Sequence, residues 1–210
     1  MHFSQRSDLQ KSTSRTSFFS GVSNYLALDD LPSRSELIFV LAGRPERKAY
    51  GMQLFSRGIA PRIILSVGRF EVRNMDEFGF RDLKLREMVK TMSPEKRHFF
   101  IDLSKVSRTV IPAGIKRIGT FGELSALATY LKSANIELMT IISTSVHLRR
   151  VRWCCQRISG LREQKILYVP VPEELSSFRR DGWWKKRDHW SYVSTELLKL
   201  LAYELRFRGE

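Results

Sequence analysis

The fold of this chain is decided by the stretch IISTSVHLRR, residues 141–150. It continues an apolar run that starts at Leu138, stops at a hydroxyl-rich turn, and then opens a helix-like segment with a histidine and two arginines. A short apolar run followed by a turn and a helix is typical of a buried parallel strand. In open parallel sheets, ligands bind at the carboxyl ends of the strands. The stretch therefore predicts both a fold class and the place of a site.

Similar apolar runs alternate with helical patterns along the rest of the chain. Parallel strands are predicted at Glu36–Leu41, Arg62–Val67, Leu138–Ile142 and Ile166–Val169, with a less clear strand at Phe99–Leu103. This alternation predicts a three-layer α/β/α, Rossmann-like fold with a mostly parallel five-stranded sheet. Numbered along the chain, the strands are expected in the order 3-2-1-4-5, with the switch point between the first and the fourth.

The connecting segments complete the expected fold. Helices are predicted at Pro45–Arg57, Phe80–Met92, Thr120–Ala134 and His147–Ile158, and residues 104–119 read as a loop. A C-terminal helix is expected to dock on the domain through its apolar stripe, which comprises Val193, Leu197, Leu200, Leu201 and Leu205. Residues 1–24, rich in serine and charge, are expected to be a flexible arm, and residues 25–208 a single domain.

Charge and composition limit the function classes. The formal net charge of +14 favours anionic partners, although scattered solvated lysines and arginines would give the same number. No RNA-recognition signature or zinc-finger spacing is present, so nucleic acid is the weaker partner class, and no metal is expected. The two cysteines, Cys154 and Cys155, are adjacent and read as buried free thiols. No apolar run spans a membrane and no signal-peptide core is visible, which predicts a cytoplasmic protein.

The turns after the first and second strands offer candidate ligand contacts. Gly43 and Gly68 close these strands, and Arg47 lies about one turn into the first helix. From there Arg47 could reach back over the Gly43 loop and bind an anion through two hydrogen bonds. The alternative is a solvated surface arginine.

The decisive stretch adds Ser143, Ser145, His147 and Arg150 to the ligand contacts. His147 is the candidate acid or base, because its side chain titrates near neutral pH. Ser145 could instead cap the following helix, and Arg150 could belong to a solvated basic face. Both His147 and Arg47 are expected at loop–helix junctions, outside the apolar stripes.

Thr120 and Glu123 form the pattern Thr-x-x-Glu before an apolar helix. This pattern is a capping-box signature, in which both side chains satisfy backbone N–H groups of the first helical turn. The functional alternative places Glu123 in the cleft as a polar or proton-handling group, with Thr120 as a ligand contact. Trp183 and Trp184 could stack on a base, but we expect them to pin the tail to the domain.

The order and spacing of several segments resemble the YdcF/SanA/ElyC-like family, a bacterial domain group of largely unknown activity. The segments are Asp29–Pro32, ELIFVLAG, Arg47, SRGIAPRIILSVG, Thr120–Glu123, STSVHLRR, Trp183-Trp184 and Glu196-x-x-Lys199. The resemblance covers about residues 25–207. It implies a Rossmann-like fold with a polar cleft at the strand ends, and some relatives are linked to envelope biogenesis. The chain departs from the family after the second strand, where two glycines are common and this chain has Ser66-Val67-Gly68-Arg69, and at Leu124, where asparagine is common.

The sequence thus favours a protein that binds an anionic small molecule of nucleotide type, with an adenosyl cofactor as one candidate. Transfer or hydrolysis of a phosphoryl or similarly activated group is the chemistry that would fit. No Walker lysine motif and no nucleophile elbow is present, which argues against a standard nucleoside triphosphatase and a Ser-His-Asp hydrolase. The alternative function is a non-catalytic regulatory or envelope-linked binding module.

Overall fold

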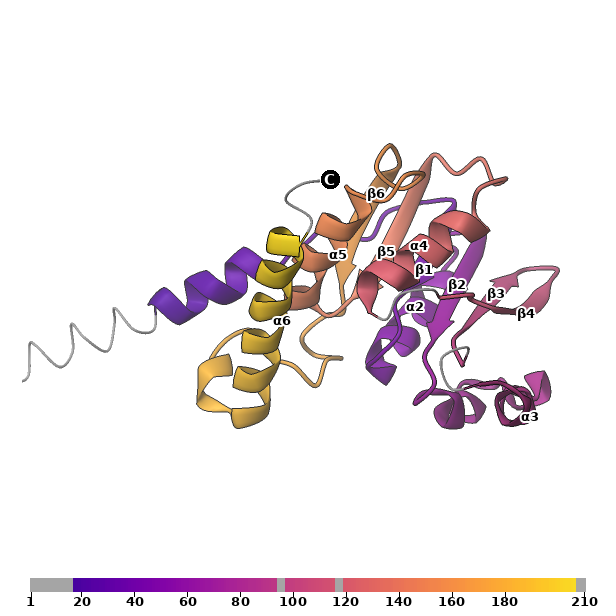
Figure 1. Ribbon diagram of the computed structural model, residues 1–210, viewed down its shortest axis with the longest axis horizontal. Helices are drawn as coiled ribbons and strands as arrows, with labels where there is room; N and C mark the ends of the chain where they lie inside the picture. Colours follow the sequence, from indigo (N-terminus) through magenta and orange to yellow (C-terminus); the bar gives the residue numbers. More distant parts are fainter. Residues whose placement is uncertain (1–16, 94–96, 116–118, 207–210) are drawn as a thin grey trace, which may run out of the picture.

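A computed structural model describes residues 17–93, 97–115 and 119–206. Its centre is a six-stranded sheet in the order β4-β3-β2-β1-β5-β6 (Figure 1). The strands are β1 (Leu37–Val40), β2 (Arg62–Val67), β3 (Phe99–Ser104), β4 (Arg108–Pro112), β5 (Leu138–Ser143) and β6 (Lys165–Pro170). The four strands β2, β1, β5 and β6 are parallel, which confirms the strand pattern predicted from the apolar runs.

The far side of the sheet differs from the expectation. Strand β3 pairs antiparallel with β2, and β4 adds a sixth strand beyond it, where the sequence predicted a loop. A tight hairpin makes this possible, because the Ser104 side chain accepts hydrogen bonds from the N–H groups of Val106 and Ser107. Residues of β4 are exposed or half-buried, so this edge strand lacks the apolar run by which the other strands were recognised.

Helices cover both faces of the sheet, as expected for three layers. One face carries α2 (Pro45–Ser56), the 3-10 segments η1 (Val72–Phe78) and η2 (Arg81–Leu83), and α3 (Leu85–Thr91). The other carries α4 (Thr120–Tyr130), α5 (Leu148–Cys155) and α6 (Arg187–Arg206). A hydrophobic core lies on each face of the sheet, and successive residues of β1 point to opposite faces. Phe39 packs in the core beneath α4 and α5, and Val40 packs in the core beneath α2. Cys154 and Cys155 are buried free thiols, which confirms that prediction, and burial raises the pKa of Cys155 to about 12.

The N-terminal segment corrects the expectation of a flexible arm. Residues 17–26 are helical, so the expectation fails for residues 17–24, whereas residues 1–16 lie outside the described part of the chain. The Trp183 indole N–H donates to the carbonyl of Phe19 at 3.0 Å, and the Phe19 ring stacks on Trp184. The tryptophan pair therefore pins the tail, as predicted, and its partner is the N-terminal helix.

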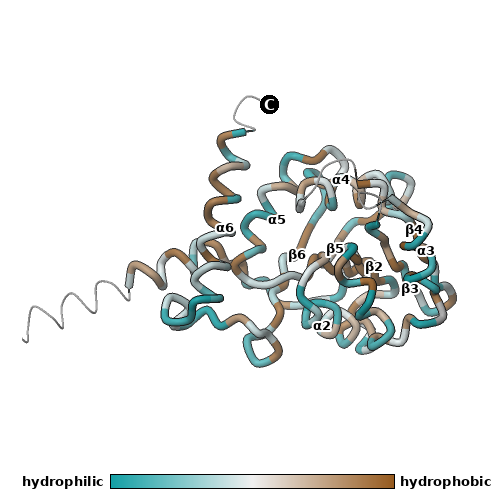
Figure 2. The backbone as a smooth tube through the Cα atoms, turned by 60° about the horizontal axis from the view of Figure 1, so that its bottom comes forward, coloured by the Kyte–Doolittle hydropathy of each residue, from teal (hydrophilic) through white to brown (hydrophobic). Residues whose placement is uncertain are grey.

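The stripe predicted on α6 is only partly buried. Val193 and Leu200 are enclosed, but Leu201 and Leu205 are 46% and 70% exposed. Figure 2 shows the C-terminal end of α6 projecting from the body of the molecule; there Tyr203 packs edge-on against Trp153, at a centroid distance of 5.5 Å, while Leu201 and Leu205 stay exposed. Among the described residues, no helix is long and apolar enough to cross a membrane.

Candidate functional site

The carboxyl ends of β1 and β5 lie side by side, and short turns lead from them into α2 and into the 3-10 segment η4 (Ser145–His147). Gly43, in the turn after β1, has φ = 123°, a left-handed conformation that favours glycine. A Cβ atom at this position would lie 3.0 Å from Nη1 of Arg47. The glycine thus leaves room for Arg47 to reach back over the loop, as the sequence analysis expected.

Arg47 is 4% exposed, so it is not a solvated surface arginine. Its Nη1 donates to the carbonyl of Ala42 at 2.6 Å, and its Nε to the hydroxyl of Thr144 at 3.1 Å. The third contact is from Nη2 to the Tyr192 hydroxyl on α6, at 3.3 Å. All three acceptors are neutral, and no carboxylate of the described residues forms an ion pair with this guanidinium. Among the described residues, Arg47 is thus a buried cation without an ion-pair partner.

Glu123 corrects the capping-box interpretation. Gly119 occupies the N-cap position of α4, and no side chain caps this helix. The Glu123 carboxylate instead accepts the N–H of Ala42 at 2.8 Å, because that peptide unit lies at the end of β1 next to the first turn of α4. Arg47 holds the carbonyl of Ala42, so the two side chains bind this residue's N–H and carbonyl. The structure thereby brings Glu123 into the same cluster as Arg47.

His147 joins the cluster through two hydroxyls, with Nδ1 2.9 Å from Ser143 Oγ and Nε2 3.1 Å from Thr120 Oγ1. Thr120 also accepts a hydrogen bond from Arg150, so its hydroxyl joins the two side chains. The pKa of His147 lies well below its usual value because of burial, then because of Arg150, Arg47 and Lys199. The ring is a neutral imidazole with both nitrogens bonded; it lies at the junction of η4 and α5, as expected, and is buried among polar groups.

Arg150 and Ser145 also differ from their sequence interpretations. Arg150 is 5% exposed and donates to both carboxylate oxygens of Glu196 on α6, each at 2.9 Å. It does not lie on a solvated face, and its charge is neutralised inside the protein. Ser145 is buried as the first residue of η4, and Thr144, not Ser145, stands in the N-cap position. Ligand contacts through Arg150 and Ser145 stay predictions.

The edge continues beyond β1 to the end of β2, where the structure reveals residues that the sequence analysis missed. Lys48 is fully buried, and its ammonium pairs with the Glu71 carboxylate. The second oxygen of Glu71 accepts the N–H of Gly68 at 2.9 Å. Burial lowers the pKa of Lys48, while Glu71 acts in the opposite direction. The sequence contained a signal for Lys48, because it directly follows Arg47 on the same helix. Consecutive helical residues point about 100° apart, so Arg47 can reach the end of β5 while Lys48 reaches the end of β2.

His98 is the second missed residue, and the antiparallel direction of β3 explains the omission. A parallel strand would have its first residues at the opposite edge of the sheet, but β3 starts at the edge where β2 ends. His98, which directly precedes β3, consequently lies beside Gly68, and its Nε2 is 2.7 Å from the Ser66 hydroxyl. Burial lowers the pKa of His98, whereas Glu123 and Glu71 raise it.

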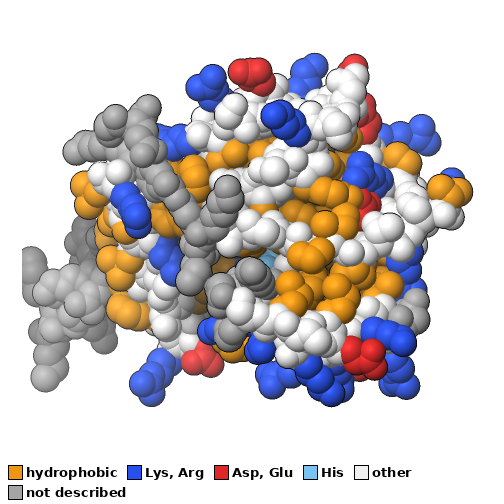
Figure 3. Space-filling model, turned by 45° about the vertical axis from the view of Figure 1, so that its right-hand side comes forward, with side chains coloured by type: hydrophobic (Ala, Val, Ile, Leu, Met, Phe, Trp, Pro, Cys, Tyr) orange, Lys and Arg blue, Asp and Glu red, His pale blue; other side chains and the backbone are white. Residues whose placement is uncertain are grey.

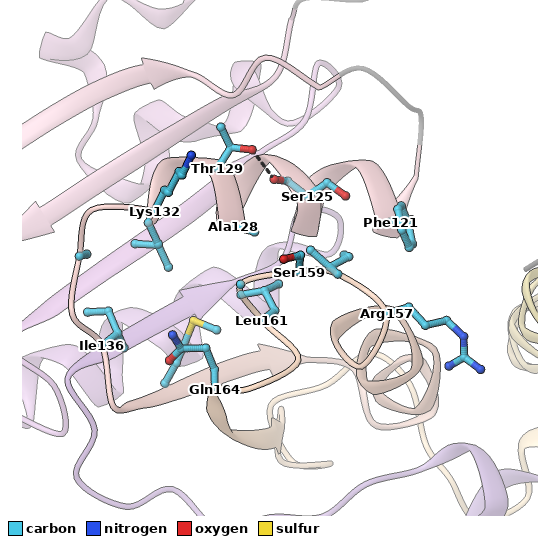
Figure 4. A pocket seen from close by; sticks show the side chains of 15 residues that line it. Phe121, Ser125, Ala128, Thr129, Lys132, Ile136, Arg157, Ser159, Leu161 and Gln164 are labelled. Carbon is cyan, nitrogen blue, oxygen red and sulfur yellow. Dashed lines mark hydrogen bonds between the residues drawn. The ribbon is translucent and has the colours of Figure 1, made fainter. Parts of the chain in front are cut away.

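Two hollows lie elsewhere on the molecule. One, of about 610 Å³, separates α4 from the β3–β4 hairpin and has an apolar floor that includes Phe100 and Ile111; Figure 3 shows hydrophobic side chains gathered on this side. The other, of about 710 Å³, lies between α4 and the chain around Leu161 (Figure 4). None of the predicted site residues lines either hollow. No group of three or more potential metal ligands occurs in the described part of the chain.

Comparisons with known proteins add no assignment to this geometry. No family model matches the sequence, and the comparisons with curated proteins and with solved structures find no match either. Membership in the YdcF/SanA/ElyC-like family therefore stays a prediction.

Proposed function

We propose that the protein binds a phosphate-bearing small molecule of nucleotide type at the carboxyl ends of β1, β5 and β2. One observation carries the proposal: among the described residues, the buried guanidinium of Arg47 has neutral hydrogen-bond acceptors and no ion-pair partner. Burying a cation without a counter-charge costs several kcal/mol. An anion bound beside Arg47 would offset this cost, and Arg150 supplies the contrast because Glu196 already neutralises it.

We further propose that the fold is Rossmann-like and related to the YdcF/SanA/ElyC-like proteins. A Rossmann-like domain related to the YdcF/SanA/ElyC-like proteins would place its ligand at the switch point between β1 and β5. Support comes from the strand order and from the buried polar cluster at that edge. Phosphoryl transfer or hydrolysis in the cytoplasm is the activity that we propose for such a site. An adenosyl cofactor is a second ligand candidate.

The test is a thermal-shift screen of the purified protein with inorganic pyrophosphate, adenine nucleotides, adenosyl compounds and sugar phosphates. A ligand at about one hundred times its Kd stabilises the folded state by about 2.7 kcal/mol. Arg47→Met should weaken binding of the best compound about 10- to 150-fold, since it removes a charge-assisted contact worth about 1.5–3 kcal/mol. Binding is measured by isothermal titration calorimetry.

Arg57→Met is the matched control, because Arg57 is an exposed residue just after the same helix and its loss changes the net charge equally. It should leave affinity within about twofold. Equal losses in both variants would show that overall charge, not the cluster, attracts the ligand. Absence of any shift with all four compound classes would overturn the proposal.

A second candidate, partner binding without catalysis, is favoured by one observation on α6. Trp190, Leu198, Leu201 and Leu205 are about half or more exposed, and their spacing places them on one side of the helix. Exposed apolar surface of this kind marks interaction sites. Association through a second copy predicts a dimer in light scattering that Leu198→Ser combined with Leu205→Ser disrupts. A monomeric wild-type protein would contradict it.

A further inference from the structure

The strand edge holds two histidines that differ in their access to protons. His147, on the β5 side, is 6% exposed and uses both ring nitrogens for hydrogen bonds with Ser143 and Thr120. His98, on the β2 side, is half-buried and uses Nε2 for its contact with Ser66. No described residue hydrogen-bonds Nδ1 of His98. Within the described ranges, only His98 thus has a ring nitrogen without a hydrogen-bond partner.

The free nitrogen of His98 faces the edge of the sheet. A Cβ atom built on Gly68 would lie 4.0 Å from His98 Nδ1 and 3.8 Å from the Cβ of Ala42. Ala42 is the residue whose N–H and carbonyl bind Glu123 and Arg47. Nδ1 therefore faces the same loops that Arg47 holds, from the neighbouring strand end.

The charges around the two rings have opposite effects. His147 has three cations as its main charged neighbours, Arg150, Arg47 and Lys199, and an added proton would be repelled by all of them. His98 is surrounded by Glu123 from α4, Glu71 from η1's leading turn and Lys48 from α2. Two carboxylates against one ammonium stabilise a protonated ring. On the β2 side the carboxylates thus oppose the effect of burial, which lowers the pKa of His98, whereas on the β5 side the charges add to the effect of burial on His147.

We propose that His98, and not His147, is the group that exchanges protons with the phosphate-bearing ligand, whose protonatable oxygen lies on the β2 side. The O–H bond of that ligand oxygen or of a water breaks, and the proton forms an N–H bond at Nδ1. Nε2–H donates to Ser66 throughout and fixes the ring. Glu123 and Glu71 balance the new charge, and the proton then returns to the product or to solvent. This assignment rests on the proposed function.

The first experiment needs no ligand. The full-length protein is treated with diethylpyrocarbonate at pH 7, and modified histidines are mapped by mass spectrometry over time. We expect His98 to react at least tenfold faster than His147, and both to react equally in 6 M urea. Ser66→Ala should leave His98 reactive, because it removes the contact to Nε2 and leaves Nδ1 in place. Faster reaction of His147 than of His98 overturns the assignment.

The second experiment adds inorganic pyrophosphate as the probe. We expect it to bind the wild-type protein and to slow modification of His98 at least threefold, while His98→Gln retains binding within about fivefold. Binding without protection of His98 places the ligand away from this ring and overturns the inference alone. Failure of all four compound classes of the thermal-shift screen to bind overturns the proposed function, even where the order of histidine reactivity is the expected one.

Discussion

The two sides of the strand edge use buried charge differently. On the β5 side, Arg150 and Glu196 form a closed ion pair with both oxygens bonded, and His147 completes a chain of hydroxyl contacts. On the β2 side, Lys48 and Glu71 form an ion pair. His98 beside them uses Nε2 for its contact with Ser66, and no described residue hydrogen-bonds its Nδ1. A buried network in which every group has a partner is rigid and specifies one arrangement. The comparison suggests a fixed side that positions the edge and an open side that exchanges protons.

The largest effect should come from breaking the fixed side. Arg150→Met removes both guanidinium hydrogen bonds from the buried Glu196 carboxylate and leaves it, among the described residues, only the exposed Lys199 ammonium at 4.0 Å, which costs about 3–5 kcal/mol of unfolding free energy. Urea denaturation measures the loss. Arg180→Met is the control, because its partner Asp29 is 55% exposed and such pairs contribute about 0–1 kcal/mol. The double variant Arg150→Met with Glu196→Leu should recover most of the loss; no recovery would mean that the pair does not carry the effect.

A second prediction compares the two histidines through pH. The pKa of His147 is lowered further than that of His98, so the folded protein resists protonation there more strongly. The contribution that each neutral histidine makes to the free energy of unfolding is fully present above the unfolded pKa of about 6.5. It is lost as pH falls from there towards the pKa of the folded protein. Each such histidine contributes a slope of up to about 1.4 kcal/mol per pH unit.

The slope is measured by urea denaturation between pH 7 and pH 5. His147→Gln should flatten it more than His98→Gln, whatever each variant does to stability at pH 7. Equal slopes in both variants would remove the electrostatic distinction between the two sides.

The parts of the fold and of the site that the sequence predicted are those that depend on local sequence patterns. The apolar runs predicted four parallel strands and their order, because a buried strand carries its own pattern. Strand β4 was missed because an exposed edge strand carries none. Arg47, Glu123 and His147 were predicted together because the ends of parallel strands meet at one edge of a sheet.

The remaining site residues depended on non-local facts. His98 was missed because the run FFIDL predicts a strand but not its direction. Only an antiparallel β3 places the residue before it at the edge where β2 ends. Glu123 has a capping-box spacing, and only the tertiary structure shows that its carboxylate binds Ala42 instead. The extent of the burial of His147 was not predicted, because it depends on α6, a distant part of the chain that brings Glu196 and Lys199 to this edge.

The smallest effect on stability is expected from Gly68→Ala, which sharpens the comparison on the open side. The new Cβ would lie 3.3 Å from Glu71 Oε2 and would narrow the approach to His98 Nδ1. The φ angle of Gly68 is not in the left-handed region, so the unfolding free energy should change by no more than about 1 kcal/mol. Carbethoxylation of His98 should slow at least twofold, whereas an unchanged rate would show that Nδ1 is approached from elsewhere.

The contact between Trp183 and Phe19 has a consequence for how the chain is made. The two residues are 164 positions apart, so a ribosome adding about 5–20 residues per second makes Trp183 roughly 8–33 s after Phe19. Throughout that interval the aromatic side of the N-terminal helix has no tryptophan to pack on. The nascent chain thus displays the apolar side of this helix until Trp183 has been made, and during that time the segment is a binding site for a chaperone.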